Sequence, residues 1–139
     1  MRAAFTLIEL VITLAIVSIL SAVAFPKVGR LLDSIHVSGA VREIATLFNT
    51  ARHVAIASSS RTSVEIDAAR RTIHIVAEGD TIQTREIGLE HDVTLEATRP
   101  RMSYSASGQG YGAANLSVVV RRRLSVDTVF VSRLGRLRH

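Results

Sequence analysis

The chain has 139 residues, the size of one ordinary domain, and 47% of them are hydrophobic. It contains no cysteine, so disulfides, thiolate metal sites and cysteine nucleophiles are excluded. Lysines and arginines (17) outnumber acidic residues (12) to give a net charge of +5, and all of the basic residues except Lys27 are arginines, which suit planar contacts to carboxylate or phosphate groups.

The first feature in the chain is a predominantly apolar run over residues 5–25 that contains neither glycine nor proline and stops at Pro26. As a helix it would be about 31 Å long, roughly the thickness of the hydrocarbon core of a bilayer. Glu9 stands inside this run, where an unpaired carboxylate costs about 2.5–3.5 kcal/mol at mid-bilayer. A chain cut before Phe5 would have a new amine one helical turn from Glu9, so the pattern indicates processing at that position.

The segment Ala4-Phe5-Thr6-Leu7-Ile8-Glu9 resembles the cleavage site of type IV pilins and type II secretion pseudopilins. The resemblance implies cleavage between Ala4 and Phe5 by a prepilin peptidase, followed by N-methylation of Phe5. It also implies that Glu9 serves subunit assembly by pairing with the Phe5 amine of its own or a neighbouring subunit. Pro26 falls where many of these proteins have a proline, whereas Ala4 stands where the family usually has glycine.

An ordinary secretory signal is the alternative interpretation of this segment. Ala22-Val23-Ala24 forms an A-x-A cleavage site after a basic start and an apolar stretch. The apolar core is long for such a signal, and Glu9 is misplaced in one. The prepilin-like interpretation is therefore preferred.

Helical periodicity continues beyond Pro26, which should kink the helix because proline lacks an N–H group. Apolar residues recur at three- and four-residue steps, and Ser58-Ser59-Ser60 should end the helix. The apolar positions are Val28, Leu31, Leu32, Ile35, Val41, Ile44, Ala45, Phe48, Ala51 and Ala55. Asp33 is expected among the charged residues of the other side. One helix over residues 5–57 would be roughly 80 Å long.

From Arg61 the period of the sequence changes to two, which predicts strands. A hairpin turn is expected over residues 67–71 and another turn at Glu78-Gly79-Asp80. Strands are expected at residues 64–66, 73–75, 81–87, 93–96, 102–105, 116–121, 125–132 and 136–138. The glycine-rich segment 107–115 has neither a phosphate-binding spacing nor a following helix, so a loop is expected there.

The order of these parts extends the resemblance over the chain, because segments 51–56 and 131–138 are similar to the GspH/FimT group of minor pseudopilins and minor pilins. The expected fold is α+β and type IV pilin-like, with a long N-terminal helix (a membrane stalk) packed on an antiparallel β-rich globular head. The expected parts are a leader at 1–4, a transmembrane or fibre-core helix at 5–25, its amphipathic continuation at 26–60, and the head at 61–139.

No residue pattern proposes an enzyme, a metal site or a cofactor. The histidines, at positions 36, 53, 74, 91 and 139, share no short metal-ligand spacing, and neither G-x-S-x-G nor H-E-x-x-H occurs. His74 alternates with Ile73 and Ile75 and should point away from the core, while His91-Asp92 should form a turn.

Arginines concentrate near the C-terminus, with Asp127 the only acid among them. In a strand, Arg121 and Arg123 would share one face and Arg122 would lie on the other. A solvated strand edge is one interpretation of these charges. Contact with an acidic partner or with DNA phosphates is the other, and its candidate residues are Arg133, Arg136 and Arg138. In some FimT-like pilins a C-terminal Gly-Arg-x-Arg, here starting at Gly135, is associated with DNA uptake.

Two non-enzymatic functions follow from the resemblance. The preferred one is a structural minor pseudopilin of a type II secretion system, assembling into a periplasmic pseudopilus that drives export of folded proteins. The alternative is a FimT-like minor type IV pilin that binds DNA through its C-terminal arginines for uptake. Either function implies a single-pass protein of the bacterial inner membrane with its C-terminal head in the periplasm. Its partners would be prepilin peptidase and the other pseudopilins or pilins of a hetero-oligomeric fibre.

Overall fold

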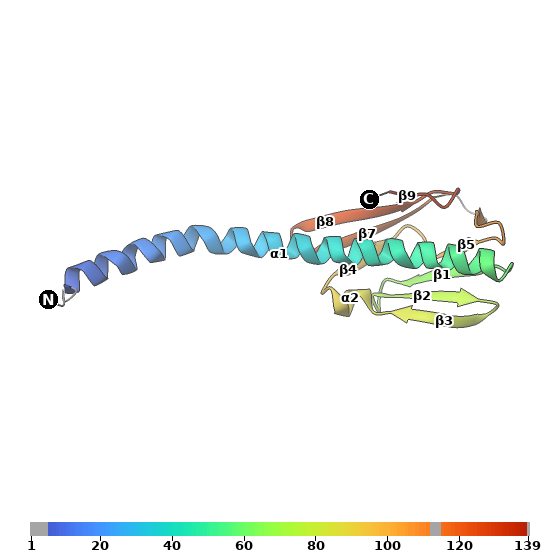
Figure 1. The fold of residues 1–139 in the computed structure, drawn as a ribbon, viewed down its shortest axis with the longest axis horizontal. Coiled ribbons are helices and arrows are strands. Elements are labelled where there is room, and N and C mark those ends of the chain that lie inside the picture. The colour runs from blue at the N-terminus through green and yellow to red at the C-terminus, as the bar shows by residue number, and fades with distance from the viewer. Residues whose placement is uncertain (1–5, 112–114, 139) are drawn as a thin grey trace. The chain divides into compact units, whose positions relative to one another are not determined.

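The structure is a computed structural model that describes residues 6–111 and 115–138. In these residues a long helix, α1 (Leu7–Ala57), precedes a series of short strands and a one-turn helix, α2 (Ile87–Glu90) (Figure 1). The strands are β1 (Thr62–Asp67), β2 (Thr72–Ala77), β3 (Asp80–Arg85), β4 (Thr94–Ala97), β5 (Arg101–Tyr104), β6 (Gly110–Tyr111), β7 (Leu116–Arg122), β8 (Ser125–Val131) and β9 (Leu137–Arg138). The predicted α+β class with antiparallel strands is confirmed.

The chain divides into two compact units, Met1–Leu32 and Asp33–His139, and α1 contributes residues to both. In the first unit nearly all described side chains are exposed. An 18-residue window of α1 reaches a mean hydropathy of 2.5 with none of it buried, so the helix is long and apolar enough to cross a membrane. The backbone stays helical at Pro26. The kink expected there, and the part boundaries after residues 25 and 60, stay predictions.

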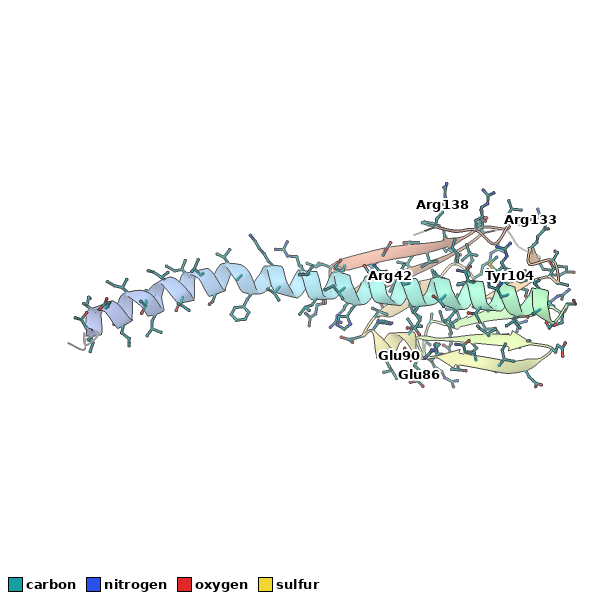
Figure 2. All side chains as sticks on the ribbon, in the orientation of Figure 1. Arg42, Glu86, Glu90, Tyr104, Arg133 and Arg138 are labelled. Atoms are coloured by element: carbon teal, nitrogen blue, oxygen red, sulfur yellow. The ribbon has the colours of Figure 1, made fainter. Side chains whose placement is uncertain are left out.

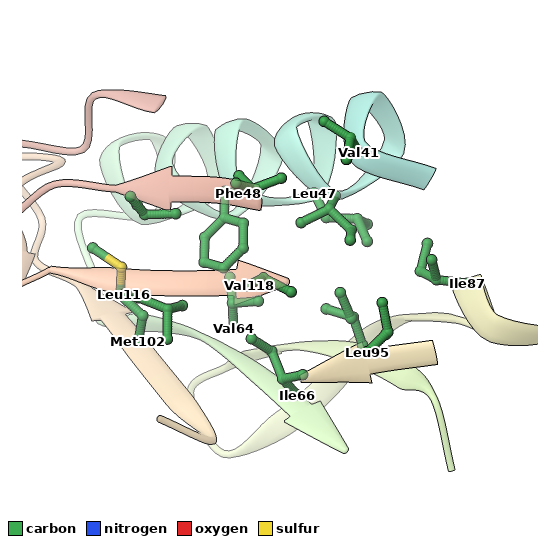
Figure 3. Close-up of a cluster of buried hydrophobic side chains, with 14 of the residues drawn as sticks. Val41, Leu47, Phe48, Val64, Ile66, Ile87, Leu95, Met102, Leu116 and Val118 are labelled. Carbon is green, nitrogen blue, oxygen red and sulfur yellow. The ribbon is translucent and has the colours of Figure 1, made fainter. Parts of the chain in front are cut away.

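In the second unit the described strands form two antiparallel sheets. One has the order β3-β2-β1-β5-β6 and the other the order β4-β7-β8-β9. One face of each sheet joins α1 in a single apolar core, in which Phe48 of the helix lies among Val64, Met102 and Val118 of the strands (Figure 3). This core holds the second unit together.

The helical periodicity predicts the core face of α1 only in part. Apolar residues three and four apart are buried from Val37 to Ala55, as expected for a helix that covers a sheet. The buried apolar residues of α1 are Val37, Ala40, Val41, Ile44, Leu47, Phe48, Ala51 and Ala55. In contrast, Ile35, expected in the same apolar series, is 57% exposed, and Asp33 is buried.

Both early turns form where the sequence predicts them. The turn between β2 and β3 uses Glu78 and Gly79 with φ of 55° and 96°, as in the type I′ turns that suit twisted hairpins. The predicted strand 81–87 instead ends at Arg85, because the chain turns into α2 at Ile87, a helix that the period-two interpretation missed.

The glycine-rich segment is not entirely a loop, because it contains the short strand β6. Gly110 there donates its N–H to the Arg133 carbonyl at 2.9 Å. A Cβ at Gly110 would lie 2.9 Å from that carbonyl oxygen and 3.0 Å from Met102 Cε. The glycine therefore permits a close approach of backbones.

Candidate functional site

Helix α1 begins with a reciprocal cap between Thr6 and Glu9. The Glu9 N–H donates to Thr6 Oγ1 at 3.3 Å, and the Thr6 N–H and hydroxyl both lie 3.4 Å from Glu9 Oε2. This is the geometry of a capping box, and the carboxylate also meets the positive end of the helix dipole. The T-x-x-E spacing carries this signal, which the sequence interpretation of Glu9 as an assembly residue overlooked.

The cleavage site Ala4-Phe5 and the methylation site Phe5 lie outside the described residues. The pairing of Glu9 with the Phe5 amine therefore stays a prediction. The capping box is compatible with it, because a carboxylate has two oxygens and several acceptor sites.

Arg52, in segment 51–56, lies close to Gly135 of segment 131–138, the two segments that resemble the GspH/FimT group. Cβ atoms placed on Gly108 and Gly135 would lie 3.2 and 3.4 Å from Arg52 Nε, so both backbones pass close to this side chain. These glycines have φ of 72° and 73°, in the left-handed region that favours glycine. The β5–β6 loop and the β8–β9 turn therefore both pack against the Arg52 side chain of α1. Its Nε is buried and has no hydrogen-bond partner among the described residues.

Tyr104 of β5 is the strongly perturbed ionisable group of this region (Figure 2). Its side chain is only 1% exposed. Burial raises the pKa of its hydroxyl to about 12, and the nearby positive charge of Arg52 partly opposes this rise. A phenol with so high a pKa stays neutral at physiological pH. Tyr104 is therefore a packing residue of the core rather than a proton donor or acceptor.

Arg122 centres a largely buried ion-pair network in the second unit. Its Nε lies 3.0 Å from Asp33 Oδ1, and its second guanidinium nitrogen lies 3.1 Å from Asp92 Oδ2. The Nε–H lacks hydrogen-bond alignment toward Asp33, so charge rather than a directed bond holds this pair. The expectation that Asp33 lies on the charged outer side of the helix is wrong, because Arg122 pairs with it in the interior.

The predicted separation of Arg121 and Arg122 is confirmed, since Arg121 is exposed and Arg122 points inward. Arg123 does not continue the strand. It lies in the β7–β8 turn with φ of 48°, and its guanidinium is 3.8 Å from Asp33. The arginine triplet is therefore divided between surface, interior and turn.

A second polar cluster connects α1 with α2 through Glu43, Glu90 and His91. His91 Nε2 lies 2.8 Å from Glu43 Oε2, and the ligand atoms of all three lie within 4.8 Å of one another, a spacing that could hold a metal ion. Arg85 occupies the same cluster, with nitrogens 3.5 Å from Glu43 and 3.9 Å from Glu90. A guanidinium already compensates these carboxylates, so the geometry fits a structural ion-pair network better than a cation site.

The three predicted C-terminal contact residues are brought to one region. Arg133, Arg136 and Arg138 are all exposed on the β8–β9 turn and β9. Figure 2 labels Arg133 and Arg138. Arg136 and Arg138 border a surface hollow of about 470 Å³ that Phe130 and Leu134 also line. These arginines are accessible to a partner.

The start of the exposed apolar helix α1 lies in a segment that matches a family model. Residues 1–25 match the model of the prokaryotic N-terminal methylation motif. The long helix followed by antiparallel sheets is the type IV pilin-like fold that the sequence predicts.

Two groups of solved structures share this fold. The type IV minor pilin FimU of Pseudomonas aeruginosa superposes with a TM-score of 0.62 at 14% identity, covering 73% of this chain and 86% of FimU. The minor pseudopilin EpsH of the Vibrio cholerae type 2 secretion system gives a TM-score of 0.60 at 14% identity, covering 74% of this chain and 94% of EpsH. No curated protein matches this chain by sequence. The likeness at this identity shows the fold.

Proposed function

We propose that the chain is a minor subunit of a type IV pilin-like fibre, anchored by α1 in the bacterial inner membrane before assembly, with its head in the periplasm. One observation carries the proposal. The helix that bears the methylation motif also exposes apolar side chains throughout its first unit, from Leu7 at 83% to Leu32 at 51%. Such a surface needs lipid or other apolar helices around it.

Within this class we favour a minor pseudopilin of a type II secretion system. This preference follows the resemblance of the sequence, and the similarity to EpsH, which covers 94% of that chain, is compatible with it. Its partners would be prepilin peptidase and the other pseudopilins of a hetero-oligomeric fibre. The exposed Arg133, Arg136 and Arg138 favour the second candidate, a minor pilin that binds DNA for uptake.

Processing and assembly test the general proposal. Intact mass and N-terminal sequencing of membrane-extracted protein should give a mature chain that starts at methylated Phe5. A strain without prepilin peptidase should keep the leader. Glu9→Val should insert in the membrane but be depleted from sheared fibres, whereas Thr13→Val, on the same helix, should assemble normally. A mature terminus at Phe25, or equal recovery of the Glu9 variant in fibres, would refute the proposal.

Deletion strains and DNA binding separate the two systems. Loss of the gene should reduce export of a folded protein if the favoured function is correct, and should reduce DNA uptake if the alternative is. The full chain in detergent should bind duplex DNA only under the alternative, with an affinity that falls steeply with salt. Replacing Arg136 and Arg138 with alanine would then lower the log–log salt slope by about 1.8, while Arg99→Ala, also exposed, would change it less.

A further inference from the structure

Strand β8 is longer than the strand beside it on its outer edge. In the described residues, β9 pairs only with Phe130 and Val131, whereas β7 pairs with β8 along its whole length. Residues 125–128 of β8 therefore have no described ladder partner on the side away from β7. An open edge of this kind is a template for another strand.

The alternation of a β-strand determines which backbone N–H and C=O groups of β8 point to this edge. The Ser132 N–H donates to the Arg136 carbonyl at 2.9 Å, so Ser132 faces the β9 side. Every second residue before it, including Thr128 and Val126, presents its N–H and C=O to the same side. The Thr128 N–H is already occupied, because Asp127 Oδ1 accepts it at 2.7 Å. The Val126 N–H and C=O and the Thr128 C=O remain for a partner.

Apolar side chains accompany this edge on the outer face of the sheet. Val126 and Phe130 alternate with the buried Val129 and Val131, and they are 46% and 52% exposed. Leu124 at the β7–β8 turn is 86% exposed. At the other end, Phe130 and Leu134 line the 470 Å³ hollow, which can take one side chain of an added strand.

Charge around the edge is strongly one-sided. Arg121, Arg136 and Arg138 are exposed near its two ends, and the exposed Arg123 at the β7–β8 turn lies 3.8 Å from Asp33. Asp127 is the only acid of β8, and its carboxylate is engaged with the neighbouring N–H. A second copy of this chain would bring like charges together, whereas acidic side chains would complement the arginines.

We propose that the β8 edge, defined by Val126, Thr128 and Phe130 with flanking Arg121 and Arg138, binds an extended segment of another protein that alternates apolar and acidic side chains. The segment adds a strand to the sheet, places its apolar side chains over Val126 and Phe130, and directs its carboxylates to the arginines. Asp127 lowers the affinity of the edge for any added strand, because its carboxylate occupies the Thr128 N–H. This inference goes beyond the proposed function and does not depend on which fibre the subunit joins.

A synthetic peptide that alternates valine and glutamate is the probe, measured against the full chain in detergent micelles by fluorescence anisotropy and amide hydrogen exchange. Binding should weaken with salt and should slow exchange of the Val126 amide. Two control peptides separate the contributions. Lysine in place of glutamate should abolish binding through charge, and backbone N-methylation should abolish it by removing the donors that pair with the edge.

Variants of the chain complete the test. Val126→Pro removes the outward N–H but no bond to β7, so it should weaken binding at least about tenfold with little change in circular dichroism. Asp127→Ala frees the Thr128 N–H and should strengthen binding severalfold, an effect that a merely structural role would not produce. Arg138→Glu should weaken binding more than the matched Arg99→Glu. Unchanged affinity in Val126→Pro, protection confined to other strands, or self-association through this edge in sedimentation would overturn the proposal.

Discussion

Removing Asp33 should strongly destabilise the second unit. Asp33 is 5% exposed and the Arg122 side chain is 16% exposed, so both groups have left most of their water. Deleting one partner of a buried pair costs about 3–5 kcal/mol, because the other charge stays buried and uncompensated. Arg122 keeps the Asp92 carboxylate at 3.1 Å, which places Asp33→Ala near the lower end, at about 3 kcal/mol.

The same arginine provides the control. Asp92 is 73% exposed, so its pairing with Arg122 is largely screened, and Asp92→Ala should cost less than about 1 kcal/mol. Replacing both members of the buried pair, as in Asp33→Leu with Arg122→Met, removes the uncompensated charge along with the pair. The double variant should therefore lose less stability than Asp33→Ala alone.

Urea unfolding followed by circular dichroism measures these differences on the full chain in detergent, where the apolar part of α1 stays helical and the transition reports the head. Asp33→Ala should lower the urea midpoint with an unchanged slope. An Asp33→Ala loss no larger than that of Asp92→Ala would refute the argument. So would a double variant less stable than Asp33→Ala, because the pair would then contribute more than its burial costs.

Three further predictions concern the same unit and the same assay. Because burial raises the pKa of Tyr104 from 10.0 to about 12, stability should be complete below pH 10 and fall by about 2–3 kcal/mol as the pH rises to 12; Tyr104→Phe should remove this fall. Phe48→Ala should cost about 3–5 kcal/mol, since Phe48 is fully buried in the core, whereas the exposed Phe130→Ala should cost far less. Arg123→Gly should stabilise the unit by about 0.5–1 kcal/mol, because glycine adopts the positive φ of 48° without strain; a loss would show that the contact with Asp33 matters more.

Local patterns predict the elements of this fold well because those elements depend on neighbours in the sequence. The alternation of Ile73, His74 and Ile75 places the histidine outside the core, as the structure confirms through its bonds to hydroxyls of Thr72 and Thr84. The two turns of the first hairpins are confirmed for the same reason.

Features that depend on distant partners escape such patterns. The helical pattern predicts that Asp33 is exposed, whereas in the structure it is buried beside Arg122, which is far along the chain. The strand β6 in the glycine-rich segment forms because Gly110 can approach Arg133, which no local rule anticipates. The Thr6–Glu9 cap is local, and its T-x-x-E spacing predicts it. The sequence interpretation assigned Glu9 to subunit assembly alone.

The shared core of α1 and the sheets also constrains when the head can fold. The helix is synthesised first, but Ile44 and Phe48 share one core with Val118 and Val129 on β7 and β8, which follow much later in the chain. Until then the apolar face of the helix has no complete cover, and contacts of such large sequence separation form slowly. The core of the second unit can therefore be completed only after β7 and β8 have been made.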